Sequence, residues 1–242
     1  MHHLPSAAAG NQQRNALRAA GLAIAAGTIF STIAVALDGP ASGDSPRAFL
    51  MSMIAIGGTK AAVHLVAMAA VLAYAFGFTT LARKLDLQRP LVLAGLSAYL
   101  FGCMAMLGAT LIDGFISSDV AAAFANAPSP ESIKQGYNLV MYGDIVLNDL
   151  ARLAWVLQAL ATIAWAPALL AGAGWQRATG VVGLLSGGLV LAAVVEAGAM
   201  MTMQALLSII LAQAVWNLAA AVLLVRAKVE ARGVPMEAAL AT

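Results

Sequence analysis

Charged residues are scarce in this chain of 242 residues: 10% are Asp, Glu, Lys or Arg, whereas 62% are hydrophobic. Soluble domains carry about 25% charged residues, so this composition excludes an ordinary soluble globular protein. The 13 Lys and Arg residues are too few and too scattered to bind nucleic acid. The single cysteine, Cys103, excludes an internal disulfide. These shortages together favour a membrane protein.

Motifs of several enzyme classes are missing as well. The sequence contains no glycine-rich nucleotide loop, no His-Glu-x-x-His zinc motif and no Gly-x-Ser-x-Gly elbow. Only one histidine, His64, lies inside an apolar segment. A haem site within the spans that needs two histidine ligands is therefore excluded. The sequence therefore identifies no cofactor.

Long apolar runs are what the chain does contain. A membrane-spanning helix needs about 20 mostly apolar residues. Six segments meet this requirement and leave no room for a separate soluble domain. We therefore predict an all-α, six-transmembrane-helix bundle that forms a single membrane domain over residues 1–242. The predicted spans are residues 18–37, 61–82, 90–112, 145–170, 180–200 and 204–225.

The distribution of basic residues predicts the orientation of the bundle. Nine of the 13 lie before span one, between spans two and three, between spans four and five, or after span six. By the positive-inside rule, both termini are then cytoplasmic in a bacterial-type inner membrane. Ala34-Val35-Ala36 resembles a signal-peptide cleavage site, but the apolar run before it exceeds the usual length of about 7–15 residues. We expect span one to be retained.

Each of the two longer outer loops carries a helix-start signal, so we predict short outer-face helices there. In the first loop, residues 38–60, Ser45 can cap a helix that has Pro46 at its first position. Gly57-Gly58 should separate this helix from span two. In the second loop, residues 117–144, Ser129-Pro130-Glu131 starts a helix that can run into span four.

The ionisable residues of the spans gather toward the predicted outer face. Charge inside a bilayer is costly, so such a collection marks a candidate site. We expect these residues to border an outer-facing polar pocket that binds a ligand or handles protons. The candidates are His64, Glu196, Asp149, Arg152, Lys60 and Asp113.

Each candidate also has a plainer interpretation. His64 shares a helix face with Lys60, four residues earlier, and can shuttle protons, bind metal or simply bond a neighbouring helix. Glu196 has no basic residue near it on its own helix, so it either pairs with His64, Lys60 or Arg152 across helices or is neutral. Asp149 and Arg152, three residues apart, can form a local ion pair. Asp113 can simply end span three at the membrane interface.

Methionines gather near the outer boundary, where they could form a copper-binding site. Met200, Met201 and Met203 could offer thioether ligands, which select copper(I). Methionine is also a flexible filler of apolar cores, and the sequence lacks a repeated Met-x-x-Met array. We therefore predict ordinary packing and no metal at these residues.

The run Trp-Ala-Pro-Ala-Leu-Leu, Trp165–Leu170, ends the fourth predicted span and precedes a short turn and a Gly-rich fifth span. With the long outer loop before it, the stretch Leu153–Gly188 resembles a group of bacterial six-helix integral membrane proteins of unknown function. The resemblance implies a six-span fold and gives no information about an activity.

These observations predict a protein that binds a small or lipophilic ligand, or helps to transport it, through an outer-facing polar pocket. Six spans are few for an alternating-access transporter, so besides membrane lipid we expect a homodimer or a membrane partner protein. One alternative is a membrane-embedded enzyme with His64 and Glu196 as its acid–base pair, with or without a metal. Another is an accessory subunit of a membrane complex that binds no ligand.

Overall fold

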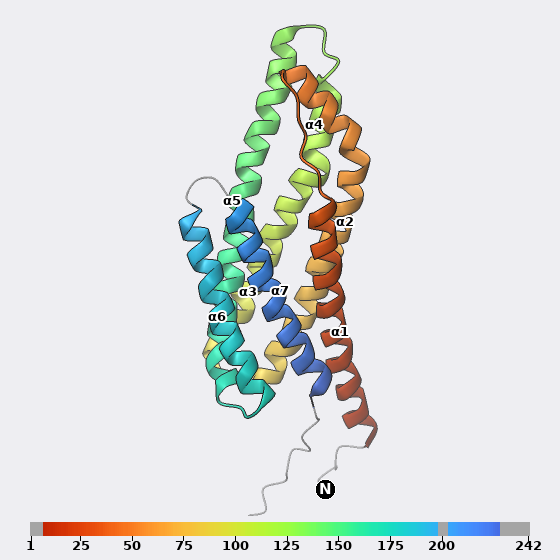
Figure 1. Ribbon diagram of the computed structural model, residues 1–242. Coiled ribbons are helices and arrows are strands. Elements are labelled where there is room, and N and C mark those ends of the chain that lie inside the picture. The colour runs from red at the N-terminus through yellow and green to blue at the C-terminus, as the bar shows by residue number, and fades with distance from the viewer. Residues whose placement is uncertain (1–6, 198–202, 228–242) are drawn as a thin grey trace, which may run out of the picture.

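The computed structural model describes residues 7–197 and 203–227, and all regular secondary structure in these ranges is helical. Six of the helices are long and apolar enough to cross a membrane (Figure 1), which confirms the predicted six-helix bundle. They are α1 (Ala7–Leu37), α2 (Pro46–Leu85), α3 (Pro90–Leu111), α5 (Pro130–Leu170), α6 (Trp175–Glu196) and α7 (Met203–Arg226).

Helix α2 runs without a break through Gly57 and Gly58, so the predicted separation of a short outer helix from span two is wrong. The start of the helix is as predicted: the hydroxyl of Ser45 accepts a hydrogen bond of 3.2 Å from the backbone N–H of Ala48. A glycine inside a helix costs about 1 kcal/mol relative to alanine. Packing of α2 against its neighbours therefore outweighs the local preference of two glycines.

The second loop is also more helical than predicted. A π-helical turn, η1 (Ile112–Ile116), joins α3 directly to the short helix α4 (Ser117–Phe124). The predicted helix start at Ser129 is confirmed, since its hydroxyl accepts from the N–H of Ser132 at 3.1 Å and α5 then continues through span four. Only a short connection between α4 and α5 remains outside the helices.

The first part of α2, α4 and the first part of α5 project beyond the other helices and form what we call the cap (upper end of Figure 1). At 1.5 Å per residue, the 40 and 41 residues of α2 and α5 extend about 60 Å, roughly twice the thickness of a hydrocarbon core. A hydrocarbon core of this thickness therefore cannot enclose either helix along its whole length. The apolar core of the cap consists of Leu50, Met53, Ala121, Ala125, Ile133 and Val140.

Four aromatic rings fill the interior of the bundle in the half that lies away from the cap. Phe78 stacks on Trp165 and Trp216 at centroid distances of 5.7 and 5.9 Å, and Tyr99 lies 4.6 Å from Phe78. The indole N–H of Trp165 donates to the carbonyl of Val92 at 3.1 Å, so this buried polar group is satisfied. We call these four rings the aromatic floor.

Helix α5 is held close to α3 by a small residue. A Cβ atom on Gly102 of α3 would lie only 3.0 Å from the carbonyl oxygen of Ala154 and 3.0 Å from Cγ of Gln158. Where no hydrophobic effect drives helices together, small residues allow the close backbone approach that packing requires. This contact fixes α5 in the position from which Gln158 reaches the interior of the bundle.

Candidate functional site

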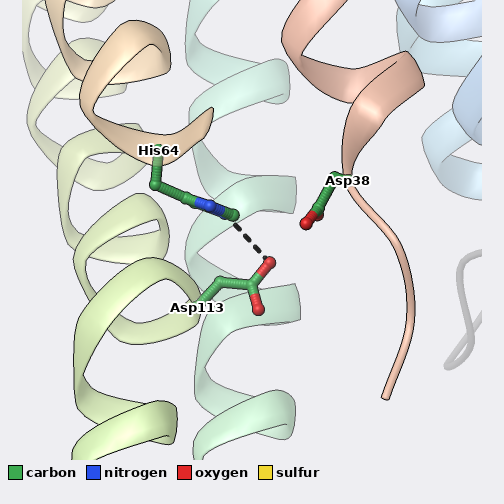
Figure 2. Close-up of side chains that lie close together, drawn as sticks. All are labelled: Asp38, His64 and Asp113. Carbon is green, nitrogen blue, oxygen red and sulfur yellow. Dashed lines mark hydrogen bonds and ion pairs between the residues drawn. The ribbon is translucent and has the colours of Figure 1, made fainter. Parts of the chain in front are cut away.

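Four charged side chains meet where the cap joins the bundle, and we call them the charge cluster. Helix α2 supplies Lys60 and His64, η1 supplies Asp113, and Asp38 follows the last residue of α1. The Nζ atom of Lys60 lies 2.6 Å from Oδ1 of Asp113 and 3.3 Å from Oδ1 of Asp38. The Nε2 atom of His64 lies 3.0 Å from Oδ2 of Asp113, as Figure 2 shows.

Local backbone structure explains how these residues meet. Lys60 and His64 are four residues apart on α2 and so share one face of the helix. Asp113 lies in the π-helical turn, a rare local structure that often occurs at functional sites. The next residue, Gly114, is buried directly against His64, because a Cβ atom at position 114 would overlap the His64 side chain. Glycine here lets η1 bring Asp113 to α2.

Burial makes the pairing in the charge cluster necessary. Lys60 and His64 are only 7% and 8% exposed, and the side chains of Asp113 and Asp38 are 24% and 27% exposed. An unpaired charge at such a depth is strongly destabilising. Lys60 lies between the two carboxylates and is thereby neutralised.

His64 is held by acceptors at both of its ring nitrogens. Its Nδ1 lies 2.8 Å from the backbone carbonyl oxygen of Lys60, and its Nε2 faces Asp113. A carbonyl and a carboxylate can only accept hydrogen bonds, so the surroundings favour the imidazolium form, in which both nitrogens donate. The cluster then contains two cations and two anions and is balanced in charge.

A cavity of about 300 Å³ extends from Asp38 into the half of the bundle nearest the cap. Helices α1, α2, α3, α5 and α7 form its walls. Most of its lining is apolar, and Asp38 is the one charged residue in it. Its other polar lining residues are Thr28, Ser31, Thr32, Tyr74, Thr110, Gln158 and Gln213.

The polar groups of the cavity differ in whether the protein satisfies them. The hydroxyl groups bond within the protein; for example, Ser31 Oγ lies 2.9 Å from the hydroxyl of Tyr74, and Thr28 donates to the carbonyl of Ile24 at 2.8 Å. The side-chain amides of Gln158 and Gln213 make no hydrogen bond in the part of the chain that the structure describes. Gln158 is only 8% exposed. Both amides line the cavity, so they can hydrogen-bond a ligand or water there.

The aromatic floor closes the cavity at the end away from the cap. Phe78 is one helical turn beyond Tyr74, Trp165 is two turns beyond Gln158, and Trp216 follows Gln213 by three residues. The cavity therefore occupies the half of the bundle nearest the cap.

Comparison with models of protein families, with curated proteins and with solved structures gives no match.

The structure brings together three of the six residues predicted for the site: Lys60, His64 and Asp113. Glu196 is the last residue of α6, is exposed, and forms no ion pair within residues 7–197 and 203–227. The expected partnership of Glu196 with His64, Lys60 or Arg152 is thus not present. Asp113 takes the place that we expected Glu196 to fill beside His64.

The expected local ion pair between Asp149 and Arg152 is also absent among the described residues. Asp149 is exposed, whereas Nε and Nη2 of Arg152 are buried and have no hydrogen-bond partner. The two side chains therefore lie in different surroundings despite their spacing. Their role in binding a ligand stays a prediction, as does that of Glu196.

Sequence reasoning missed Asp38, Tyr74 and Gln158. A signal for each was present: Asp38 is the first residue after the first apolar run, and the other two are polar residues in the middle of spans. Of the methionines considered for copper, Met200 and Met201 lie outside the described residues, and Met203 is the first residue of α7.

Proposed function

We propose that this integral membrane protein binds a small, lipophilic ligand in the cavity between the charge cluster and the aromatic floor. The observation that carries the proposal is the side-chain amide of Gln158, which lines the cavity and has no hydrogen-bond partner within residues 7–197 and 203–227. A bound molecule with a matching polar group can hydrogen-bond this amide, which typically contributes about 0.5–1.5 kcal/mol.

The lining indicates the chemistry of the ligand. The apolar walls favour a hydrophobic body, and the amides of Gln158 and Gln213 offer donors and acceptors to a neutral polar group. A volume of about 300 Å³ is at the lower end of the range of about 300–1,000 Å³ for small-molecule sites. A compact molecule of one to three rings, or part of a lipid chain with its head group, fits these limits.

Binding is better supported than transport. The aromatic floor separates the cavity from the far side of the bundle, so passage through the protein requires that Phe78, Trp165 and Trp216 move apart. We infer that the chain receives a ligand from the cap side or from the surrounding lipid. Transport would use a second copy or a partner membrane protein.

The orientation of this binding site follows from the basic residues. Arg83, Lys84, Arg89 and Arg177 lie at the end of the bundle opposite the cap. Under the positive-inside rule, this end faces the cytoplasm, and the cap then faces the periplasmic side of a bacterial-type inner membrane.

The alternatives are less well supported. An enzyme that uses His64 and Glu196 together lacks contact between the two residues in the described part of the chain. An accessory subunit without a ligand gives the unpartnered amides of Gln158 and Gln213 no role. Saturable binding of a small molecule separates the proposed function from the second alternative.

The test uses 1-aminoanthracene, an apolar fluorophore of three fused rings with one amine, added to the full chain in lipid nanodiscs. We expect saturable fluorescence that is lost in Ala67→Phe, which fills the cavity wall, and binding that is about 2–10-fold weaker in Gln158→Leu, as expected for the loss of one hydrogen bond. Gln135→Leu is the matched control, because Gln135 is exposed on the same helix in the cap. Equal binding by the wild type and Ala67→Phe would exclude the cavity as the site.

A further inference from the structure

We propose that Asp38, His64 and Asp113 bind a divalent transition-metal ion where the cap joins the bundle. One ligand atom from each residue lies within 4.8 Å of the other two. Figure 2 shows the three side chains directed toward a common point from three separate elements of the chain. This inference goes beyond the ligand cavity and does not depend on it.

The orientation of His64 is the arrangement that metal sites use. A metal-binding histidine usually donates the hydrogen of its other ring nitrogen to a carbonyl or carboxylate, which fixes the ring. Here Nδ1 contacts the carbonyl oxygen of Lys60 at 2.8 Å, and Nε2 is directed toward the carboxylates. Binding uses the lone pair of Nε2, so its proton leaves to solvent.

The spacing of the ligand atoms requires only a small adjustment. Zinc binds nitrogen and oxygen ligands at about 2.0–2.2 Å, so two ligands on one tetrahedral ion are about 3.3–3.5 Å apart. The Nε2 atom of His64 and Oδ2 of Asp113 are already 3.0 Å apart. The three ligand atoms lie within 4.8 Å of one another, so Asp38 has to approach by at most about 1.5 Å. It lies in the non-helical segment after α1, where the backbone can shift.

Lys60 bonds one carboxylate oxygen of Asp113 and leaves the other one, which faces His64, free for a metal ion. Its ammonium group bonds Oδ1 of Asp113, whereas Oδ2 faces His64. Its contact with Oδ1 of Asp38 is an ion pair of 3.3 Å without hydrogen-bond geometry, and that oxygen is buried with no hydrogen-bond partner. An under-bonded buried carboxylate oxygen is a strong acceptor for a second cation.

The ligand types limit the choice of metal. Two carboxylates and one imidazole suit Zn²⁺, Mn²⁺ or Fe²⁺, whereas copper(I) prefers the sulfur of cysteine and methionine. Three protein ligands also leave a coordination position open, as in catalytic rather than structural zinc sites. Asp38 lines the cavity, so a water molecule or a ligand oxygen can reach a metal ion at this place.

The experiment measures cobalt binding to the full chain after treatment with a chelator. All variants carry His2→Ala and His3→Ala, so that His64 is the only histidine left in the protein. We expect one Co²⁺ per chain with visible absorption bands of a low-symmetry site, displaced by Zn²⁺. Asp38→Asn should weaken binding at least tenfold. Asp119→Asn, in the exposed part of α4 and without an ion pair in the described residues, should bind as the parent does.

Two further variants distinguish a metal site from a closed ion cluster. His64→Gln keeps the size and one donor of the side chain, so it should elute as a folded protein yet lose the cobalt bands. Lys60→Gln removes a competing cation and should bind Co²⁺ as tightly as the parent or more tightly. Absence of saturable binding in the parent, or unchanged bands in His64→Gln, would overturn the proposal.

Discussion

Gly114 and His64 are packed so closely that position 114 has room for a hydrogen atom and nothing larger, because an added Cβ would overlap the Cβ of His64. The contact joins η1 to α2 directly below the charge cluster. The charge cluster therefore depends on glycine at position 114 as well as on its charged residues.

The first prediction follows from this contact. Gly114→Ala should lower the free energy of unfolding by about 1–3 kcal/mol, the usual cost of overpacking. Gly58→Ala provides the comparison, since Gly58 is also helical but has no atom within 4 Å of an added Cβ. It should be stabilising by about 0.5–1 kcal/mol. Thermal melting of both variants in detergent is the measurement, and a Gly114→Ala variant as stable as Gly58→Ala would contradict the packing described.

The second prediction concerns Asp113, which bonds both Lys60 and His64. Asp113→Leu removes the carboxylate that bonds both buried cations, so it should reduce stability by about 3–5 kcal/mol. Asp119→Leu, on the exposed side of the cap, should change the melting temperature very little. If both variants melt at the same temperature, the charge cluster does not hold the helices together.

The third prediction concerns Glu196. Since this carboxylate is exposed and has no ion-pair partner in the described ranges, Glu196→Gln and Glu196→Leu should keep wild-type stability and bind 1-aminoanthracene normally. Binding titrations and melting curves check this result. A large loss in Glu196→Gln, with Glu131→Gln unaffected, would show that Glu196 has a partner that the described contacts do not include.

The fourth prediction concerns orientation. In a Cys103→Ala background, cysteines placed at Ser42 and Asn126, both exposed near or in the cap, should react with a membrane-impermeant thiol reagent in intact cells. A cysteine at Gln88, in the exposed turn between α2 and α3, should react only after the cells are opened. The opposite pattern would invert the orientation that the basic residues predict.

The sequence predicted the features that depend on local composition. Apolar length identified six helices, and Ser45 and Ser129 marked the starts of α2 and α5. The spacing of Lys60 and His64 was enough to place them on one face of a helix. These features need only neighbouring residues, so a single sequence contains them.

Contacts between helices could not be obtained in the same way. Glu196 was expected beside His64 because both are polar residues near one membrane face. The two residues lie on α6 and α2; α6 packs on α5 and α7, whereas α2 packs on α1, α3 and α5. Depth in the membrane follows from sequence, but the neighbour of each helix depends on packing of the whole bundle. The unbroken course of α2 through Gly57 and Gly58 has the same cause.

The continuity of α2 and α5 has a mechanical consequence. Neither helix is interrupted between the cap and the cavity, since Pro167 of α5 lies beyond Gln158 in the cavity wall. Any force on the cap therefore moves the cavity walls that α2 and α5 provide. Helix α1 ends at Leu37, below the cap, and so does not share this rigid connection. A tilt of the cap would therefore act directly on the walls formed by α2 and α5 and not on the wall formed by α1.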